Sequence, residues 1–153
     1  MSLLRQPGSP MGVDDIVELL ISKEKAQCPF SFAPWEDDVN RAWKFYLKDG
    51  SDRRRYIDFV AGQAETVYYN GMEKAIRDMS DTFDRRSPSR LNFIQPSMQP
   101  FKEELASYPI SNPDIDGLIG NTFVYLKNVY LEGYKQAKKY SQQVRDYKFG
   151  HNN

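Results

Sequence analysis

Two stretches of the chain repeat apolar or small residues in alternating steps of four and three, the heptad pattern of helices that pack at a shallow angle. Seams of this length require two long helices, and that requirement constrains the fold more than any other feature of the sequence. The first seam contains Ile57, Ala61, Ala64, Tyr68, Gly71 and Ala75. The second contains Ile119, Phe123, Leu126, Tyr130, Gly133, Ala137, Tyr140, Val144 and Tyr147.

Each seam carries a glycine that is followed four residues later by an alanine. The pairs are Gly71 with Ala75 and Gly133 with Ala137. Glycine inside a helix costs about 1 kcal/mol relative to alanine, and it is best explained where two helix backbones approach closely. We therefore expect the two long helices to pack against each other near these glycines, either within one chain or between the subunits of a homodimer.

The two seams also resemble each other at an offset of 62 residues, the difference between 71 and 133. At this offset the segment 67–75 aligns with 129–137, and Tyr68 corresponds to Tyr130. Two interpretations stay open. One is an internal duplication, and the other is convergence under the same packing demand.

No segment alternates as a strand does for more than a few residues, so the sequence predicts an all-α helical bundle. We expect two shorter N-terminal helices at about 13–26 and 34–48, and long helices at about 52–86 and 113–148. A loop over 87–100, which contains three prolines, should lead into a short helical turn at 101–107.

Capping residues support these boundaries. Asp15 and Glu18 have the spacing of a capping box in the first helix, whose apolar face should come from Ile16, Val17, Leu19 and Leu20. Gly50 is a terminator for the second helix. Ser51 and Asn112 are expected N-caps of the two long helices.

The length of 153 residues suits one domain with its own core. We expect a disordered arm over 1–12, a single all-α domain over 13–149 and a frayed tail over 150–153. No uncharged run approaches the roughly 20 apolar residues that span a bilayer, and the first residues lack the apolar core of a signal peptide. With a single cysteine, Cys28, an internal disulfide is excluded, which favours a reducing, cytoplasmic location.

Catalytic patterns are sparse. The sequence has no phosphate-binding glycine loop, no paired cysteines and no zinc-protease or serine-hydrolase motif, and its one histidine, His151, lies in the last three residues. Asp78 and Asp81 share a helix face and suit magnesium with a phosphate, although the doubled glutamate clusters of known all-α phosphohydrolases are missing. We therefore expect no catalytic residue, no cofactor and no bound metal.

Two groups of cations are candidates for binding. The run Arg53-Arg54-Arg55 opposes the positive end of a helix dipole. It therefore indicates either salt bridges to the acidic N-terminal region or a contact with a phosphate or an acidic protein.

The segment 121–153 holds six basic residues, two acidic ones and five of the ten tyrosines. Basic residues interleaved with aromatic ones are typical of single-stranded RNA binding, and a solvated helix face is the alternative. The candidates here are Tyr134, Lys135, Lys138 and Lys139.

Residues 22–46 contain Ser22-Lys23-Glu24, Cys28-Pro29-Phe30 and Arg41-Ala42-Trp43, and this arrangement resembles ribosome modulation factor. That family is small and helical, and it binds and silences ribosomes. The resemblance implies two short helices joined by a Cys-Pro-aromatic linker. The linker is longer here, Phe45-Tyr46 replaces an expected glycine, and the segment is acidic where the family is basic, so the resemblance carries over the shape and not ribosome binding.

These observations predict a non-enzymatic, intracellular accessory protein, of the kind that phages and mobile elements encode. It would bind a macromolecular partner, expected to be a protein, through a surface of its helical bundle and without a membrane. One alternative is an RNA- or ribosome-associated regulator that uses the basic, tyrosine-rich last helix. Another is a metal-dependent phosphohydrolase that uses Asp78 and Asp81.

Overall fold

The computed structural model describes residues 10–83, 93–109 and 114–150, and every regular element within these ranges is helical. The all-α prediction is therefore confirmed. In chain order the elements are α1 (Val13–Gln27), α2 (Ala33–Trp43), α3 (Gly50–Phe83), α4 (Gln99–Ala106), α5 (Ile115–Ala137), the 3-10 turn η2 (Lys138–Tyr140) and α6 (Ser141–Phe149).

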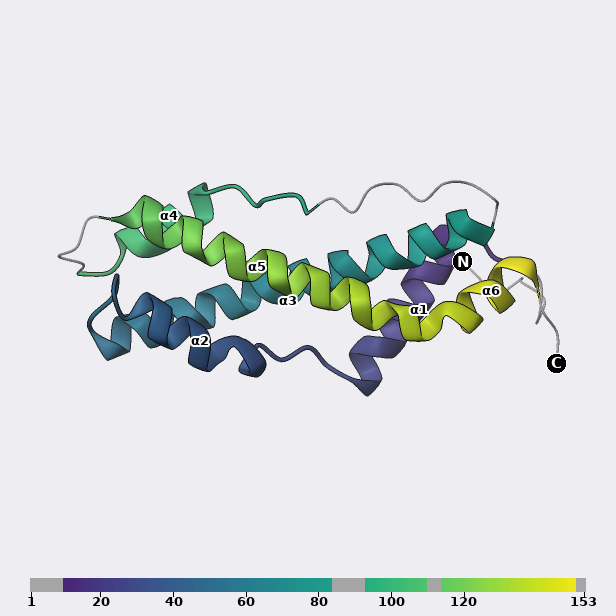
Figure 1. Cartoon of the computed structure of the whole chain (residues 1–153), viewed down its shortest axis with the longest axis horizontal. Helices are drawn as coiled ribbons and strands as arrows, with labels where there is room; N and C mark the ends of the chain where they lie inside the picture. The colour runs from purple at the N-terminus through teal and green to yellow at the C-terminus, as the bar shows by residue number, and fades with distance from the viewer. Residues whose placement is uncertain (1–9, 84–92, 110–113, 151–153) are drawn as a thin grey trace.

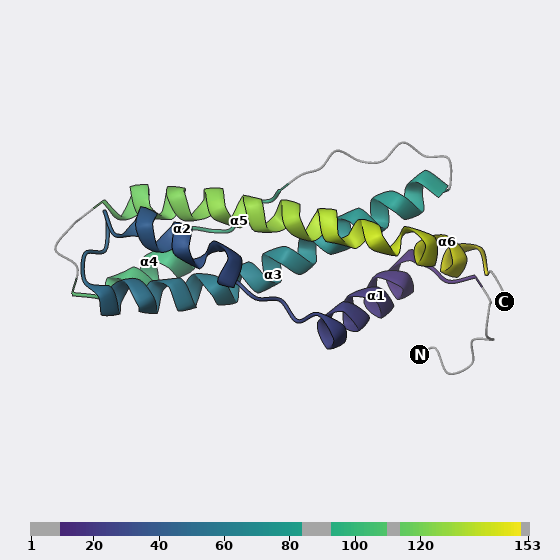
Figure 2. The same ribbon diagram turned by 60° about the horizontal axis from the view of Figure 1, so that its bottom comes forward.

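The long helices α3 and α5 run side by side along an elongated molecule, and the short helices pack around this pair (Figure 1). α2 and α4 lie near one end, where α5 begins and α3 begins. α1 and α6 lie toward the other end, as the second view also shows (Figure 2). The core follows the seam between α3 and α5 and is closed on its sides by the short helices.

α3 and α5 touch backbone to backbone at the two predicted glycines. A Cβ added to Gly71 would fall on the carbonyl oxygen of Tyr130, 3.0 Å from its carbonyl carbon and 3.1 Å from the amide nitrogen of Tyr134. A Cβ added to Gly133 would fall on the carbonyl oxygen of Tyr68, 3.0 Å from its carbonyl carbon. The predicted close approach is confirmed, and it occurs within one chain.

The contact is reciprocal. Tyr68 stands three residues before Gly71, and Tyr130 stands three residues before Gly133. Gly71 contacts Tyr130 and Gly133 contacts Tyr68, so each glycine contacts the residue that stands three positions before the glycine of the opposite helix. The offset of 62 residues thus relates the two sides of the crossing by a local twofold pseudo-symmetry. Both duplication and convergence under one packing demand produce this arrangement.

The residues of the seams lie inside the molecule. Ala75 and Ala137 are buried next to the crossing, and only Ala61 and Tyr147 among the seam residues are partly exposed. Because the seams pair with each other inside one chain, they no longer call for a second subunit.

The predicted last helix over 113–148 is confirmed in its extent, since helical residues run without a gap from Ile115 to Phe149, but a 3-10 turn that the sequence did not predict lies within it. η2 separates α5 from α6, and the amide N–H of Lys138 donates to the carbonyls of Gln136 and Lys135. No glycine or proline marks this turn in the sequence. The tighter turn brings Lys139 and Tyr140 to the carboxylate of Glu24 on α1, a contact between residues more than 100 positions apart.

The boundary between the second and third helices also differs from the prediction. α2 ends at Trp43 rather than near residue 48, and a turn follows in which the amide of Leu47 donates to the carbonyl of Trp43, at 2.7 Å. This turn returns Leu47 to the core. Gly50 begins α3 instead of terminating α2, and the carboxylate of Asp49, not Ser51, caps α3 by accepting from the amides of Ser51 and Asp52.

Other predicted ends shift in smaller ways. α1 begins after Gly12, which places Asp15 inside the helix rather than at its cap, and Leu19 is exposed although it was assigned to the apolar face. Asp114 caps α5 by accepting from the amide of Gly117. The predicted cap Asn112 lies outside the described residues, as do residues 84–86 of the third predicted helix.

Part of the predicted N-terminal arm is ordered. The amide of Met11 donates to the carbonyl of Tyr147, at 2.8 Å, and the Met11 side chain packs against the core. Residues 1–9 and 151–153 lie outside the described part of the chain. Gly150 ends α6 with a positive φ of 68°.

We expect Gly71→Ala and Gly133→Ala each to lower the free energy of unfolding by about 1–3 kcal/mol, because a methyl group would force the two backbones apart. The helix-propensity gain of alanine is smaller than this cost. The measurement is urea unfolding followed by circular dichroism.

Gly62→Ala is the matched control, because nothing lies within 4 Å of a Cβ at this position of α3. Here alanine should stabilise the protein by about 0.5–1 kcal/mol. Equal stability changes at positions 62, 71 and 133 would contradict the close crossing.

Candidate functional site

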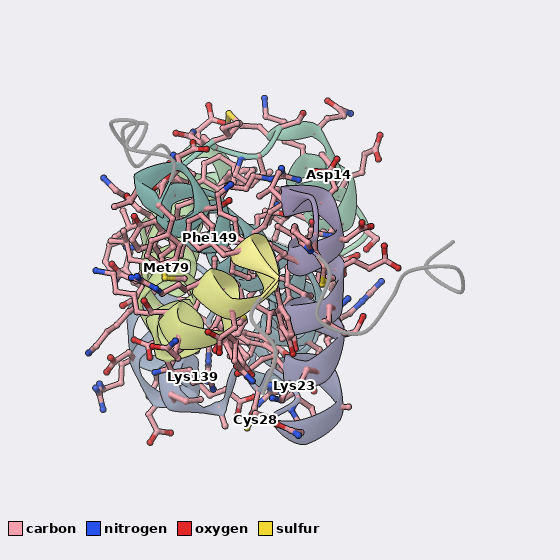
Figure 3. All side chains as sticks on the ribbon, turned by 90° about the vertical axis from the view of Figure 1, so that its right-hand side faces the viewer. Asp14, Lys23, Cys28, Met79, Lys139 and Phe149 are labelled. Carbon is pink, nitrogen blue, oxygen red and sulfur yellow. The ribbon has the colours of Figure 1, made fainter. Side chains whose placement is uncertain are left out.

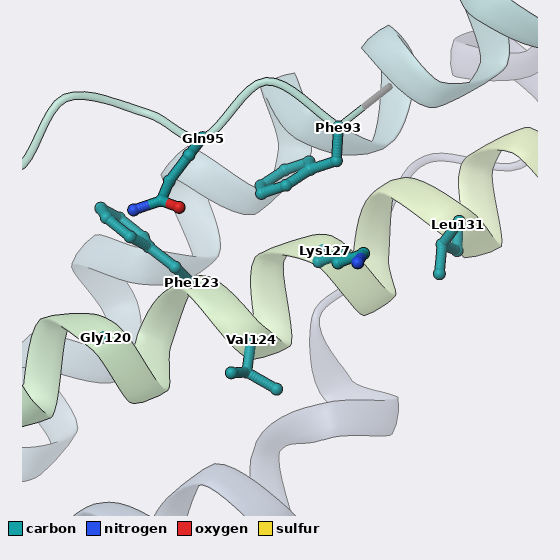
Figure 4. Close-up of a pocket in the computed structure, with 7 residues that line it drawn as sticks. All are labelled: Phe93, Gln95, Gly120, Phe123, Val124, Lys127 and Leu131. Carbon is teal, nitrogen blue, oxygen red and sulfur yellow. The ribbon is translucent and has the colours of Figure 1, made fainter. Parts of the chain in front are cut away.

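A groove of about 650 Å³ runs along the outward face of α5. One wall comes from the extended segment before α4, with Phe93 and Gln95, and the remaining lining comes from α5 (Figure 4). The lining residues of α5 are Gly120, Phe123, Val124, Lys127 and Leu131. We call this the α5 groove.

Aromatic contacts hold the floor and wall of the α5 groove in place. The ring of Phe93 packs edge-on against Tyr130, with centroids 5.5 Å apart, and the ring of Phe123 packs edge-on against Phe101, at 5.2 Å. Phe101, Phe123 and Tyr130 are themselves buried in the core. The groove is therefore built on the packed interior rather than on a loose surface loop.

The α5 groove exposes apolar side chains. Val124 is 58% exposed and Leu131 36% exposed. Ile94, which follows Phe93 in the extended segment, is 83% exposed and is not among the lining residues. Gly120 leaves open space, since no atom lies within 4 Å of a Cβ built there. Apolar side chains that are accessible along a groove are candidates for contact with a partner.

The charged side chains on this side of α5 are mainly lysines. Lys127 lies in the groove, and Lys135 and Lys138 continue along the helix beyond Leu131; all three are exposed. The segment 117–131 contains no acidic residue. The C-terminal part of this face is therefore basic.

The candidate Tyr134 does not present its hydroxyl to a ligand. It donates to Asp78 Oδ2 at 2.9 Å, and the ammonium of Lys138 lies 5.4 Å from the centre of its ring. Burial, followed by the hydrogen bond to Asp78, raises the pKa of Tyr134 to about 12. Tyr134 therefore ties α5 to α3, and Lys138 covers its ring.

Asp78, the first residue of the candidate phosphohydrolase pair, is 4% exposed. Besides Tyr134, it accepts from the ammonium of Lys74 at 2.8 Å. Asp81 lies one helical turn away and is partly exposed. Among the described residues, no group of three or more histidine, cysteine, aspartate or glutamate side chains comes close enough to hold a metal ion.

The three arginines at the start of α3 contact their own chain. Arg53 donates to Asn40 Oδ1 at 2.6 Å and to the carbonyl of Leu47 at 2.7 Å, which closes the turn between α2 and α3. Arg54 pairs with Asp58 within α3 and with Glu36 of α2, at 2.8 and 3.2 Å.

Arg55 reaches α4 instead. Its guanidinium donates to Ser107 Oγ at 3.0 Å, lies 3.5 Å from Glu104 Oε2 and sits over the ring of Tyr108. Of the two interpretations of the arginine run, the pairing of Arg54 with Glu36 fits salt bridges to the acidic N-terminal region. The other two arginines bind turns and helices that the sequence did not single out.

Lys139, which is 42% exposed, pairs with a buried carboxylate at the end of the molecule where α1 lies beside η2 and α6 (Figure 3). Glu24 is 2% exposed, and its carboxylate accepts from Tyr140 at 2.5 Å and from Lys139 at 2.9 Å. Lys23 and Lys139 both lie within 6 Å of the centre of the Tyr140 ring. This cluster attaches α1 to the end of the long pair.

The fold does not place the three arginines of α3 next to the lysines that follow Leu131. The arginines lie where α3 begins, beside the start of α5, whereas Lys135, Lys138 and Lys139 lie at the end of α5, about 34 Å away along the helix axis (Figure 1). They do not form one continuous basic surface.

Sequence reasoning misses the α5 groove, because Phe93 and Gln95 lie in the proline-containing segment 87–100, for which the sequence predicts only a loop. A signal was present in α5 itself. Gly120, Val124, Lys127 and Leu131 follow each other in steps of four, three and four, which marks a second face outside the main seam.

The chain was also compared with known proteins. No family model, curated protein or solved structure matches it. α1 and α2 are joined by residues 28–32, which is the helix–linker–helix shape that the resemblance to ribosome modulation factor implied. Among the described residues no helix is both long enough and apolar enough to cross a membrane.

The buried tyrosines should make the fold sensitive to alkali. Burial is the main cause that raises the pKa of Tyr68 and of Tyr134 to about 12 from an ordinary value of 10.0. Between these two values the unfolded chain loses tyrosine protons that the folded chain keeps, so stability present below pH 10 falls as the pH rises toward 12.

Urea unfolding at a series of pH values should therefore show a decline in the free energy of unfolding above pH 10. Tyrosine absorbance should titrate later in the folded protein than in guanidinium-unfolded protein, which serves as the control. Coincident titration curves would show that these hydroxyls are not buried.

Proposed function

We propose that this chain is a non-enzymatic accessory protein that acts by binding a protein partner in the α5 groove. The observation that carries the proposal is an exposed apolar surface on a rigid aromatic floor, with Val124 and Leu131 accessible beside the buried Phe123. Protein interfaces commonly combine a few apolar or aromatic anchors with a charged rim. Here the lysines that follow Leu131 would form part of that rim.

A protein partner fits better than RNA. Single-stranded RNA binding needs phosphate-binding cations beside exposed aromatic rings. In this chain the arginines at the start of α3 are bonded internally, Tyr130 and Tyr140 are buried, and the hydroxyl of Tyr134 is bonded to Asp78. The exposed side chains of the groove are instead aliphatic, and these suit a protein surface.

The phosphohydrolase alternative has less support. Asp78 faces the interior and is neutralised by Lys74 while Tyr134 donates to it, so its carboxylate already has structural partners. Magnesium-dependent release of phosphate that is lost in Asp78→Asn would nevertheless establish that activity in place of the one proposed.

Photo-crosslinking in the native host tests the proposal. A benzophenone amino acid at position 124 should form an adduct with another protein, because Val124 is the most exposed apolar residue of α5. The additional substitution Leu131→Glu should abolish the adduct by placing a charge in the groove, while thermal unfolding stays within about 0.5 kcal/mol of the parent, as expected for a surface substitution.

Leu19 supplies the matched control, because it is a similarly exposed leucine on α1, away from the groove. The same probe at position 19 should give no such adduct, and Leu19→Glu should leave the adduct from position 124 unchanged. An adduct with nucleic acid would favour the RNA-associated alternative. An adduct with a second copy, together with light scattering at twice the chain mass, would establish the homodimer.

A further inference from the structure

We infer that the segment received by the α5 groove is an amphipathic α-helix with acidic residues at the end that lies over the C-terminal part of α5. This inference rests on the proposed function and names the kind of partner that the same groove binds. It follows from the spacing of the groove residues, from the open space at Gly120 and from the distribution of charge along α5.

The spacing of the lining residues matches a helical partner. From Gly120 to Leu131 the outward face of α5 spans about 16 Å, or three helical turns. The steps of four, three and four are those of the buried seam that α5 presents to α3, and each position follows a seam residue by one, which places this face about 100° round the helix from the seam. A helix that packs at a shallow angle presents its own side chains at the same spacing, so it can contact the whole length of this face.

Gly120 supplies a second argument. Gly71 and Gly133 show how this chain uses glycine inside helices, because each is covered by the backbone of the opposite helix. Gly120 lies in the same helix as Gly133 and carries the same propensity cost of about 1 kcal/mol. Apart from the neighbouring backbone of α5 itself, no atom of the described residues lies within 4 Å of its Cβ position, so that space admits the backbone of a partner helix.

The open glycine alone does not define the site, since Gly62 of α3 is equally open. The surroundings differ. Gly62 has Asp58 and Thr66 one turn to either side, both polar and exposed, whereas Gly120 is followed by Val124 and the apolar groove. Of these two glycines, Gly120 is the one that lines the groove with Val124.

The charged residues along α5 determine which charges the partner helix carries and in which direction it lies. Lys127 is exposed within the face, and Lys135 and Lys138 are exposed just beyond Leu131, in α5 and η2, where Glu132 is the acidic neighbour. Before Gly120, Asp116 is exposed and lies 4.0 Å from the ammonium of Lys102, so that end of the face carries no excess of positive charge. A partner with carboxylates near the lysines and few near Asp116 matches this gradient, and complementary charges at the rim of an interface select both partner and register. A basic helix would meet like charges at three positions.

Designed peptides test the inference directly. The probe is a helical 18-residue peptide with an apolar stripe and glutamates along one half of its flanks, and its matched control replaces each glutamate with lysine. Fluorescence anisotropy should show that the acidic peptide binds about tenfold or more tightly than the basic one, since each rim pair adds a modest free energy. Amide shifts on binding should map to residues 120–131.

Two variants of the chain sharpen the test. Lys127→Glu combined with Lys135→Glu should reverse the preference between the two peptides. Gly120→Leu should weaken the acidic peptide about tenfold by blocking the close approach, whereas Gly62→Leu should leave binding unchanged. Both glycines are open, so neither variant should unfold the protein, and circular dichroism checks this.

Equal affinity for the two peptides, tighter binding of the basic peptide, or shifts that map elsewhere would overturn the inference. Tighter binding of a single-stranded RNA oligonucleotide than of the acidic peptide would overturn it in favour of a phosphate backbone. The fate of the proposed function is decided separately by the crosslink from position 124. If that crosslink reaches a protein segment that is basic or non-helical, the inference fails and the proposed function stands, and if it reaches no protein, both fail.

Discussion

The backbone contact between α3 and α5 is the interaction on which the rest of the structure depends. Gly71 and Gly133 let each helix bring a carbonyl oxygen to the place where the other would carry a Cβ. This contact sets the separation of the two long helices, and that separation determines which of their side chains reach the interior. The short helices then cover the sides of the pair.

Two buried carboxylates add side-chain contacts to this backbone contact, Glu24 by attaching α1 to the end of the long pair and Asp78 by joining α3 to α5. Glu24 accepts from Tyr140 and Lys139, and Asp78 accepts from Tyr134 and Lys74. Burying a charge is costly unless it is paired and hydrogen-bonded, and each carboxylate here meets both a cation and a hydroxyl. Several side chains that appeared suited to chemistry or to anion binding are therefore committed to holding helices together.

Because these side chains already have partners within the chain, the candidate binding surface lies on another part of the molecule. The arginines at the start of α3 close turns and pair with neighbouring helices, and the outward face of α5 presents accessible apolar residues and lysines beside a groove. Because the floor of the α5 groove is part of the core, a partner would meet a surface that is already formed. A preformed surface of this kind lowers the ordering cost of binding.

The sequence by itself determined the all-α class, the two long helices and the close approach at Gly71 and Gly133. These features follow from local propensity and from periodicity, which a single chain displays directly. The tertiary structure alone decided that the seams pair within one chain, that the 3-10 turn η2 lies within the last helix, and that Phe93 lies beside α5. Each of these depends on contacts between residues far apart in the sequence, such as Glu24 with Tyr140 and Phe93 with Tyr130, and no local pattern encodes which distant side chains will meet.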